Sequence, residues 1–424
     1  MFYYLILNIL LLTPLSSKEE LPIGFAEHEW SNQHLIDEMG TRTDPPVGPI
    51  KNIAEYEPMQ GVLIRYPFGI STSIIREMAE DVIVYCLVSS SQQNSAYNSM
   101  NNADVNMDNV EFILGSTDSY WTRDYGPWWV MDGNGDVGVV DFTYNRPRPN
   151  DNQAPFKVSE YLNVPYFSAD FVSAGGNYMT DGFGISASTQ IAYTENNECN
   201  TSDESSVPQP PCTYIDNIME DYYGIHTYHV VADPNNEYID HIDCWGKFLS
   251  HNRILIREVS TSHNQYDEIE EIADYFSSIL TSEGTPWEVF RIYTPNNQPY
   301  TNSLILNNKV FVPIMNSSWD GPALEVYQAA MPDHVILPFT GSWESTDALH
   351  CRAKGIPDLN YVQFNDGDIN MDDFVNVLDV VFAVNFVLGS EDLSSTQLQI
   401  ADINDDGILN ILDIILIVNI ILGS

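Results

Sequence analysis

Basic residues are scarce in this chain. Its 424 residues include 16 Lys and Arg against 60 Asp and Glu, which gives a formal net charge of −44. So strong an excess of negative charge repels polyanions, which excludes nucleic acid and anionic lipid as partners. It attracts cationic substrates and divalent cations. Adaptation to salty surroundings, where acidic surfaces keep proteins soluble, explains the same charge equally well.

Long apolar runs are also few. The apolar stretch at residues 1–12 has the length of a signal-peptide core and is short for a membrane span. It lacks the usual positive charge before it, because Lys18 is the first basic residue. We still expect residues 1–17 to be a signal peptide and the protein to be secreted or extracellular. No later stretch has the length and apolar character to cross a bilayer, so we expect a chain that is not membrane-spanning.

The chain has only five cysteines, too few for a disulfide scaffold. Cys199 and Cys212 flank a polar, proline-rich stretch and are candidates for a disulfide in an oxidising compartment. The odd number leaves at least one free thiol. Cys86 lies in the apolar run VIVYCLV, which favours an inert core position. Cys351 lies in a polar stretch between His350 and Arg352, and basic neighbours favour the nucleophilic thiolate.

Residues 52–357 alternate short apolar runs with turn-rich segments and follow an extension at residues 18–51 that ends in a proline-rich stretch. β-branched and aromatic runs predict strands, and helical spacing predicts helices. The mixture indicates an α/β or α+β fold and leaves the strand order open. The glycine-rich stretch at residues 173–189 has neither the GxGxxG spacing nor Gly-Lys-Ser/Thr, which argues against a dinucleotide or phosphate loop there. Strands are expected at 82–88, 137–142, 254–259 and 309–314, and helices at 270–280 and 323–330.

Residues 358–424 contain twelve acidic residues and no Lys or Arg. They also contain a repeat, with GDINMDDFVNVLDVVFAVNFVLGS followed by ADINDDGILNILDIILIVNIILGS. Such a duplication predicts a separate domain. Oxygen-bearing side chains share one spacing in both copies and suit calcium, which takes six to eight oxygen ligands. The expected ligands are Asp368, Asn370, Asp372, Asn376 and Asp379, then Asp402, Asn404, Asp406, Asn410 and Asp413.

The repeat resembles dockerin domains, whose paired loop-helix units resemble half of an EF-hand. The resemblance covers residues 366–424 and implies a small all-α domain, two Ca²⁺ sites and a cohesin-like partner. Asp373 stands where the loop normally has glycine for its sharp turn, whereas Gly407 keeps that glycine in the second copy.

Two carboxylates in residues 52–357 have settings suited to chemistry. Asp124 lies among aromatic residues in YWTRDYGPWW, where exclusion of water strengthens its attraction for a cation. A pair with Arg123, or a turn cap, is the structural alternative. The alternation His241-Ile-Asp243 suggests a strand with both polar side chains on one face, a setting for a proton shuttle. Metal ligation or a satisfied core pair explains it too.

Five motifs then fall in one order, namely WTRDYGPWW, GGNYMTDG, HIDCWGK, YTNSLILN and DALHC. In this order they resemble the guanidine-modifying enzymes, and bacterial peptidylarginine deiminases in particular, from about residue 55 to residue 351. The resemblance implies the five-bladed α/β propeller of the pentein type. It also implies hydrolysis of arginine to citrulline and ammonia through a covalent thiouronium on cysteine, with no cofactor for catalysis.

The same resemblance assigns roles to individual residues. Cys351 matches the nucleophile and His241 the general acid and base. Asp124 and Asp243 match the carboxylates that grip the guanidinium, and Asn302 a supporting active-site asparagine. Trp121 is expected at the substrate.

Substrate preference depends on Arg146 and Arg148, which alternate around a proline and suggest anion binding. Their match to the peptidylarginine deiminases implies capture of a substrate α-carboxylate, hence an arginine-containing peptide with a C-terminal arginine. Structural salt bridges are the alternative for this pair. Two other functions stay open: deimination of agmatine or free arginine, and a non-catalytic secreted binding protein displayed by its dockerin.

Overall fold

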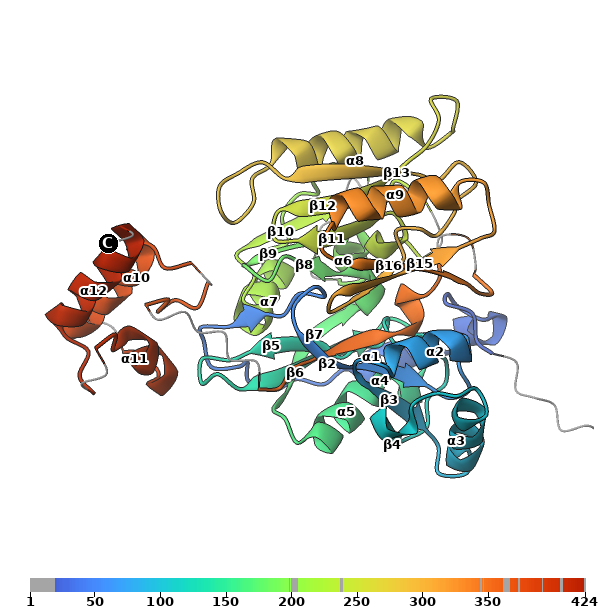
Figure 1. The fold of residues 1–424 in the computed structure, drawn as a ribbon, viewed down its shortest axis with the longest axis horizontal. Coiled ribbons are helices and arrows are strands. Elements are labelled where there is room, and N and C mark those ends of the chain that lie inside the picture. The colour runs from blue at the N-terminus through green and yellow to red at the C-terminus, as the bar shows by residue number, and fades with distance from the viewer. Residues whose placement is uncertain are drawn as a thin grey trace, which may run out of the picture.

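A computed structural model of the protein describes most of the chain after residue 19. The described residues fold into an α/β body that ends at Pro357 and a helical tail (Figure 1). The expected signal peptide at 1–17 lies outside them, as do Asp373 and Asp406 of the two loops. The described ranges are 20–197, 199, 205–236, 239–343, 345, 347–360, 367–372, 374–390, 392–404 and 407–422.

The α/β body contains five separate sheets, and each combines an antiparallel pair of strands with a parallel pair. In one of them, β11 (Gly246–Ser250) runs antiparallel to β12 (Arg253–Glu258), and α8 (Tyr266–Ser278) leads to the parallel strand β13 (Glu288–Tyr293). A helix is needed there because parallel strands require a crossover connection. Three other sheets repeat this order: β1 (Lys51–Asn52), β5 (Trp128–Met131), β6 (Val137–Tyr144) and β7 (Tyr166–Ser173); β8 (Met179–Thr180), β9 (Ile185–Thr189) and β10 (Thr227–Val231); β14 (Leu304–Leu306), β15 (Lys309–Ile314) and β16 (Val335–Thr340).

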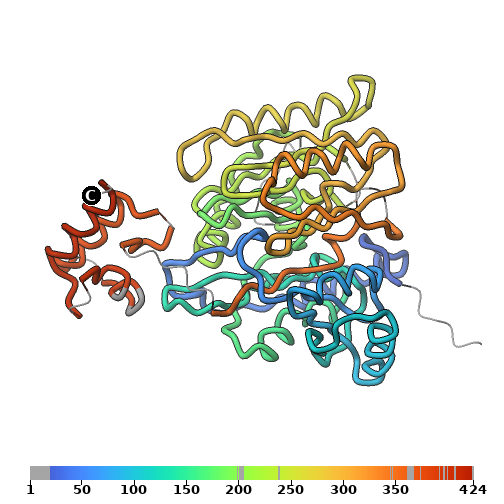
Figure 2. Tube along the Cα trace, in the orientation of Figure 1, coloured from blue at the N-terminus to red at the C-terminus, as the bar shows by residue number. Residues whose placement is uncertain are grey.

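The fifth sheet joins the two ends of the body. β17 (Lys354–Pro357) runs antiparallel to β2 (Met59–Arg65), followed by the parallel strands β3 (Ile83–Val88) and β4 (Val110–Leu114). The orange end of the body therefore lies beside a blue strand in Figure 2. The α/β class is confirmed, and five sheets are the number that five blades require. Closure into a propeller stays a prediction.

Helices cover the sheets with apolar faces. In α8, Ile269, Ile272, Ala273 and Phe276 are buried, the spacing of one helical face. The other helices of the body are α2 (Thr72–Met78), α3 (Gln93–Asn101), α4 (Pro149–Asn152), α5 (Ala154–Leu162), α6 (Ile191–Thr194), α7 (Thr213–Tyr223) and α9 (Asp320–Ala330). Among the described helices, none combines the length and the apolar character of a membrane span.

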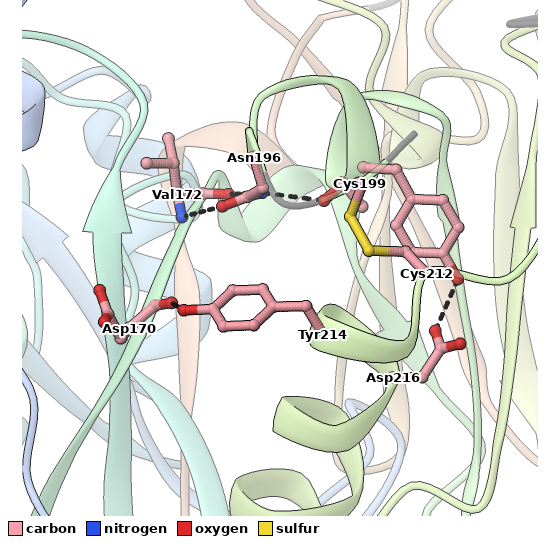
Figure 3. The surroundings of a disulfide bond; sticks show 9 residues. Asp170, Val172, Asn196, Cys199, Cys212, Tyr214 and Asp216 are labelled. Carbon is pink, nitrogen blue, oxygen red and sulfur yellow. Dashed lines mark hydrogen bonds between the residues drawn. A yellow bond between two sulfur atoms is a disulfide. The ribbon is translucent and has the colours of Figure 1, made fainter. Parts of the chain in front are cut away.

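A disulfide joins Cys199 and Cys212, with their Cα atoms 5.3 Å apart (Figure 3). It ties the segment after α6 to the start of α7, so the pairing considered from the sequence is present. Cys86, Cys244 and Cys351 are buried and take no part in this disulfide.

The extension before the first strand is packed onto the body. Residues 20–26 form no regular element and lead into a 3-10 helix (Glu27–Asn32) and α1 (His34–Met39). Ile23 and Glu29 in this extension are buried. It is therefore part of the folded body.

The tail consists of α10 (Val377–Val387), α11 (Ser395–Ala401) and α12 (Ile411–Leu422). Helices α10 and α12 belong to the two repeat copies and pack against each other through Ala383 and Ile417. Asn376 and Asp379 form a capping box at the start of α10, so loop residues also begin the helix.

Candidate functional site

The candidate site lies where five strands begin. Each sheet has one antiparallel pair of strands that is followed along the sheet by a parallel pair. Two to four positions before the first strand of that antiparallel pair lies a polar residue. The segments before these strands meet at one end of the sheets, so residues far apart in sequence converge there. The residues are Asp124 before β5, Asn177 before β8, Asp243 before β11, Asn302 before β14 and Cys351 before β17.

Gly176 is the point around which three polar side chains gather. A Cβ atom placed there would lie 2.5 Å from Asp124 Oδ1, 2.7 Å from His241 Nδ1 and 3.2 Å from Asp243 Oδ2. No residue with a side chain fits at such distances, so glycine allows the backbone to approach this closely. His241 Nδ1 lies 3.6 Å from Asp124 Oδ1.

Asn302 holds the loop that carries the thiol. Its side-chain oxygen accepts hydrogen bonds from the backbone N–H groups of Ala348, at 2.9 Å, and His350, at 3.0 Å. Its amide nitrogen donates to Cys351 Sγ at 3.1 Å. The Cys351 sulfur lies 3.6 Å from Asp243 Oδ2. The five residues expected to be catalytic therefore occupy one buried cluster.

Burial dominates the charge state of the cluster. It raises the pKa of Asp124 well above the usual aspartate value, and the negative charges of Asp243 and Asp347 raise it further. Burial lowers the pKa of His241 to about 4, despite the opposing charge of Asp243, so His241 is neutral at physiological pH. Within the described residues, neither oxygen of Asp124 accepts a hydrogen bond. The cluster thus lacks a cation.

The thiolate expected at Cys351 is not favoured in this structure. Burial raises the pKa of the thiol well above its usual value, and the carboxylates of Asp243, Asp347 and Asp124 add to the shift. The basic neighbours do not offset this effect. Arg352 lies over the rings of Tyr120, Trp121 and Trp343 at 5.1, 5.1 and 5.3 Å, and His350 is held between two carboxylates.

Glu55 and His350 are site residues that sequence reasoning missed. His350 Nδ1 lies 2.6 Å from Asp243 Oδ2, and its Nε2 lies 2.6 Å from Glu55 Oε2. A neutral imidazole has one N–H, so both contacts are hydrogen bonds only when the Asp243–His350–Glu55 array holds one additional proton. Burial and the charge of Arg123 oppose this, because they lower the pKa of His350. Arg123 and Lys247 contact Glu55 at 2.6 and 2.9 Å. Although burial opposes ionisation, the charges of His350, Lys247 and Arg123 keep the pKa of Glu55 well below its usual value.

This array also keeps Asp243 ionised. Burial raises the pKa of Asp243, but the hydrogen bond and charge of His350 outweigh it, and the net shift is downward. The only local sign of the array was the His-Cys pair in DALHC, because its partner Glu55 lies 295 residues away in sequence. Arg123 pairs with Glu55, so the considered pairing of Arg123 with Asp124 is not formed.

The strand expected for His241-Ile-Asp243 is wrong. His241 is extended, with φ −87° and ψ 136°, and caps a single 3-10 turn (Ile242–Cys244). The turn forms because Cys244 and Trp245 donate backbone hydrogen bonds three residues back. Both polar side chains still reach the space around Gly176.

Trp121, Arg146 and Arg148, the expected substrate-binding residues, lie beside the cluster but contact the N-terminal extension. Arg148 forms a buried ion pair with Glu29 at 2.8 Å, the structural alternative considered for this residue. The Arg146 guanidinium lies 5.0 Å from the centre of the Phe25 ring. Its positive charge contributes to the lowered pKa of His241.

The tail loops are closed by their last aspartates. Asp379 accepts backbone hydrogen bonds from Ile369, at 2.8 Å, and Asn370, at 3.1 Å. Asp413 accepts from Asn404 at 3.3 Å, and Gly407 has the left-handed φ of +81°. The donor oxygens suit calcium. Among the described residues, no group of three Asp, Glu, His or Cys side chains is placed to hold a metal ion by itself. The described donors are Asp368, Asn370, Asp372, Asn376, Asp379, Asp402, Asn404, Asn410 and Asp413.

The raised thiol pKa predicts how the alkylation rate of Cys351 depends on pH. An acid with a raised pKa stays protonated to higher pH, so the thiolate fraction and the alkylation rate should rise about tenfold per pH unit. Iodoacetamide labelling between pH 6 and pH 9, followed by peptide mass spectrometry, measures this rate. The variant C351A gives the background from the other thiols. A rate that levels off below pH 8 would contradict the environment described here.

Comparison with known proteins identifies this combination of sheets and buried residues. Residues 54–357 match the family model described as Porphyromonas-type peptidyl-arginine deiminase, and residues 366–422 match the dockerin type I domain. A protein of Mycoplasma mycoides, provisionally named an agmatine deiminase, is 25% identical over 269 residues, covering 54% of this chain and 71% of its own length.

Solved structures share the fold of the body. The agmatine deiminase of Enterococcus faecalis has a TM-score of 0.63 and 18% identity, covering 75% of this chain and 100% of its own. A provisionally named arginine deiminase from Porphyromonas gingivalis has a TM-score of 0.63 and 17% identity, covering 73% and 98%. The match over residues 54–357 covers most of the chain, which therefore belongs to the Porphyromonas-type peptidyl-arginine deiminase family and carries a C-terminal dockerin type I domain.

Proposed function

We propose that this protein is a secreted deiminase that converts peptidyl-arginine, with a preference for C-terminal arginine, to citrulline and ammonia. One observation carries the proposal: the buried thiol of Cys351 lies beside two carboxylates, Asp124 and Asp243, in a cluster that lacks a cation. A guanidinium supplies that cation. We also propose that the five sheets close into a five-bladed propeller around this cluster.

The guanidinium is planar and carries several N–H donors, which two carboxylates can bind from different sides. Asp243 is ionised in the ligand-free site because of His350. Asp124 ionises when the substrate brings its positive charge, since an opposite charge lowers a carboxyl pKa. The dry site strengthens both contacts.

The reaction then follows in two steps. Cys351 sulfur bonds to the central guanidinium carbon and passes its proton to the neutral His241, giving a tetrahedral adduct. Breakage of one C–N bond releases ammonia, with His241 supplying the proton, and leaves a thiouronium on Cys351. His241, neutral again, takes a proton from water, whose oxygen attacks the same carbon. Breakage of the C–S bond yields citrulline and returns the thiol. Substrate binding lowers the thiol pKa through its positive charge, so the nucleophile forms where it is used.

Agmatine is the second candidate substrate, because relatives with a solved structure or a curated name carry the name agmatine deiminase. Agmatine has no carboxylate. Arg146, buried beside the cluster, supports a carboxylate-bearing substrate instead. A non-catalytic binding protein is the remaining alternative, and it leaves the buried thiol of Cys351 without a role.

The close contacts of Gly176 predict that the variant G176A loses deiminase activity. The added methyl group displaces Asp124 or His241, and such a displacement costs about 100-fold in kcat/KM. The matched control is G321A, since a Cβ at Gly321 meets no atom within 4 Å. Citrulline release and thermal unfolding of both variants check this. Full activity in folded G176A would show that the three side chains do not act around this glycine.

Substrate preference is tested with two matched peptides, one ending in free arginine and one with that carboxylate amidated. We expect faster citrulline release from the free acid, by roughly tenfold or more, because a charge-assisted hydrogen bond to Arg146 or Arg148 is lost in the amide. C351A serves as the inactive control. Equal rates would remove the carboxylate role and make internal arginines substrates. Turnover of agmatine alone would replace the peptide proposal.

We propose that the tail binds Ca²⁺ through the two loops and docks onto a cohesin-like partner. Apolar surface supports the docking, since more than half of the exposed large apolar side chains described belong to the tail. A surface of this kind is typical of protein–protein interfaces. The side chains are Val377, Leu378, Val381, Val387, Leu388, Ile408, Ile411, Leu412, Ile415, Ile420, Ile421 and Leu422. A tail that docks outside the cell agrees with secretion.

Calcium should stabilise the tail. With the metal at about 100 times its dissociation constant, binding adds about 2.7 kcal/mol to the free energy of unfolding. Calorimetry of the full chain with Ca²⁺ or a chelator measures the shift of the tail transition. D379N, which alters the loop-closing aspartate, should lose most of the shift, while D392N at an exposed position outside the loops should keep it. The same transition with and without chelator would argue against calcium.

A further inference from the structure

The three side chains expected at the substrate already have a ligand, and it is a segment of this chain. Trp121 Nε1 donates a hydrogen bond at 3.0 Å, Arg146 Nε one at 3.1 Å, and Arg148 Nη2 two at 2.7 Å. All the acceptors are backbone oxygens of four consecutive residues, Leu21, Pro22, Ile23 and Gly24. A stretch of polypeptide that bends at Ile23 and Gly24 is therefore bound through its main chain.

The same segment presents a carboxylate to Arg148. Glu29 Oε1 accepts from Arg148 Nε at 2.8 Å, and Oε2 accepts from Nη2 at 3.0 Å. This two-point contact is the one an α-carboxylate makes with a guanidinium. The side chains of the pair are 1% and 4% exposed. Although burial opposes ionisation, Arg148 lowers the pKa of Glu29, which stays charged.

The segment also closes the path to the thiol. Ile23 is 1% exposed and belongs to the apolar cluster that contains Trp121, Cys244 and Cys351. Phe25 covers the Arg146 guanidinium. With this segment in place, the exposed fraction is 0% for Cys351 and 1% for Asp124. A substrate arginine cannot reach these atoms unless the residues that cover them move, and Ile23 packs in the same cluster as Cys351.

We propose that residues 20–30 bind as an internal ligand in the groove lined by Trp121, Arg146 and Arg148, the side chains expected to bind a substrate carboxylate. A substrate peptide then reaches Cys351 by displacing this segment. The nature of the substrate rests on the proposed function, whereas the occupation of the groove does not. The protein is thus held closed by its own N-terminal extension.

The test is the rate at which iodoacetamide labels Cys351 in the full chain at a fixed pH, with the site located by peptide mass spectrometry. E29A removes the carboxylate from Arg148 and should label about tenfold faster than the parent, since local opening becomes easier. The matched control is E27A, which removes an exposed carboxylate from the same 3-10 helix. It should label at the parent rate.

Cys86 reports whether a variant is still folded, because it is 0% exposed in β3, away from the segment. If E29A also labels Cys86, the milder variant I23A decides the question, with faster labelling of Cys351 alone expected. An unchanged rate for Cys351 in folded E29A and I23A overturns the proposal and makes residues 20–30 a fixed wall of the site.

Labelling separates this inference from the deiminase proposal, because it needs no turnover. Faster labelling of E29A without turnover of any peptide keeps the occupied groove and removes the enzyme function. Turnover by the parent with an unchanged labelling rate in both variants keeps the enzyme function and removes the occupied groove. When both proposals hold, E29A also has a lower KM for the peptide ending in free arginine, because the peptide no longer competes with Glu29.

Discussion

Buried negative charge without a matching cation is the constraint around which this protein is organised. Asp124 and Asp243 face Gly176 in a buried space, and ionisation of Asp124 or of the nearby Cys351 thiol would add to the negative charge of Asp243. Burying a charge is costly unless it is paired. The cationic side chains Arg123 and Lys247 are directed to Glu55 instead. The ionised forms of Asp124 and Cys351 are therefore unfavourable in the absence of a cation, and the pKa values of both groups are raised for this reason.

The sheets make this concentration of charge stable. Each polar residue follows a turn or 3-10 segment and precedes a buried strand, so its backbone is fixed within a few residues of a hydrogen-bonded ladder. Asn302 adds a direct tie, since one amide group fixes the backbone of the thiol loop and contacts the sulfur. Glu55 fixes the positions of charged groups in a similar way, since its carboxylate contacts His350, Arg123 and Lys247. Both residues place charges and backbone before any substrate arrives, which is how a preorganised site lowers a barrier.

Much of this arrangement could be predicted from the sequence, because the residues concerned lie in short local motifs. Asp124, His241, Asp243, Asn302 and Cys351 lie in short motifs whose order already points to one family, and the structure brings them together. The tail was read in the same way, because the repeat places its oxygen-bearing residues in one register. The α/β class followed from alternating apolar runs, whereas the strand order needed long-range pairing that no local pattern contains.

The features that were missed depend on distant partners. The array of Glu55, His350 and Asp243 joins three segments, and the chemistry of each residue is set by the other two. The thiol was expected to be acidic because of its sequence neighbours, but burial raises its pKa, and the carboxylates of Asp243 and Asp124, which are distant in sequence, raise it further. Arg148 was expected at the substrate, and its partner Glu29 comes from a short 3-10 helix in the N-terminal extension, 119 residues away in sequence. The His241 strand failed for a smaller reason, since three-residue alternation also fits a single 3-10 turn.

The pairing of β17 with β2 has a consequence for synthesis. Cys351 lies three residues before the strand that joins the end of the body to its beginning. Of the strands in the body, a ribosome makes this one last, so a growing chain holds Asp124 and His241 long before it holds Cys351. An incomplete product that stops before residue 351 also leaves the edge of β2 without its partner, and exposed edges promote aggregation. Only two residues separate Cys351 from β17, so the growing chain acquires its thiol and its last sheet partner almost together.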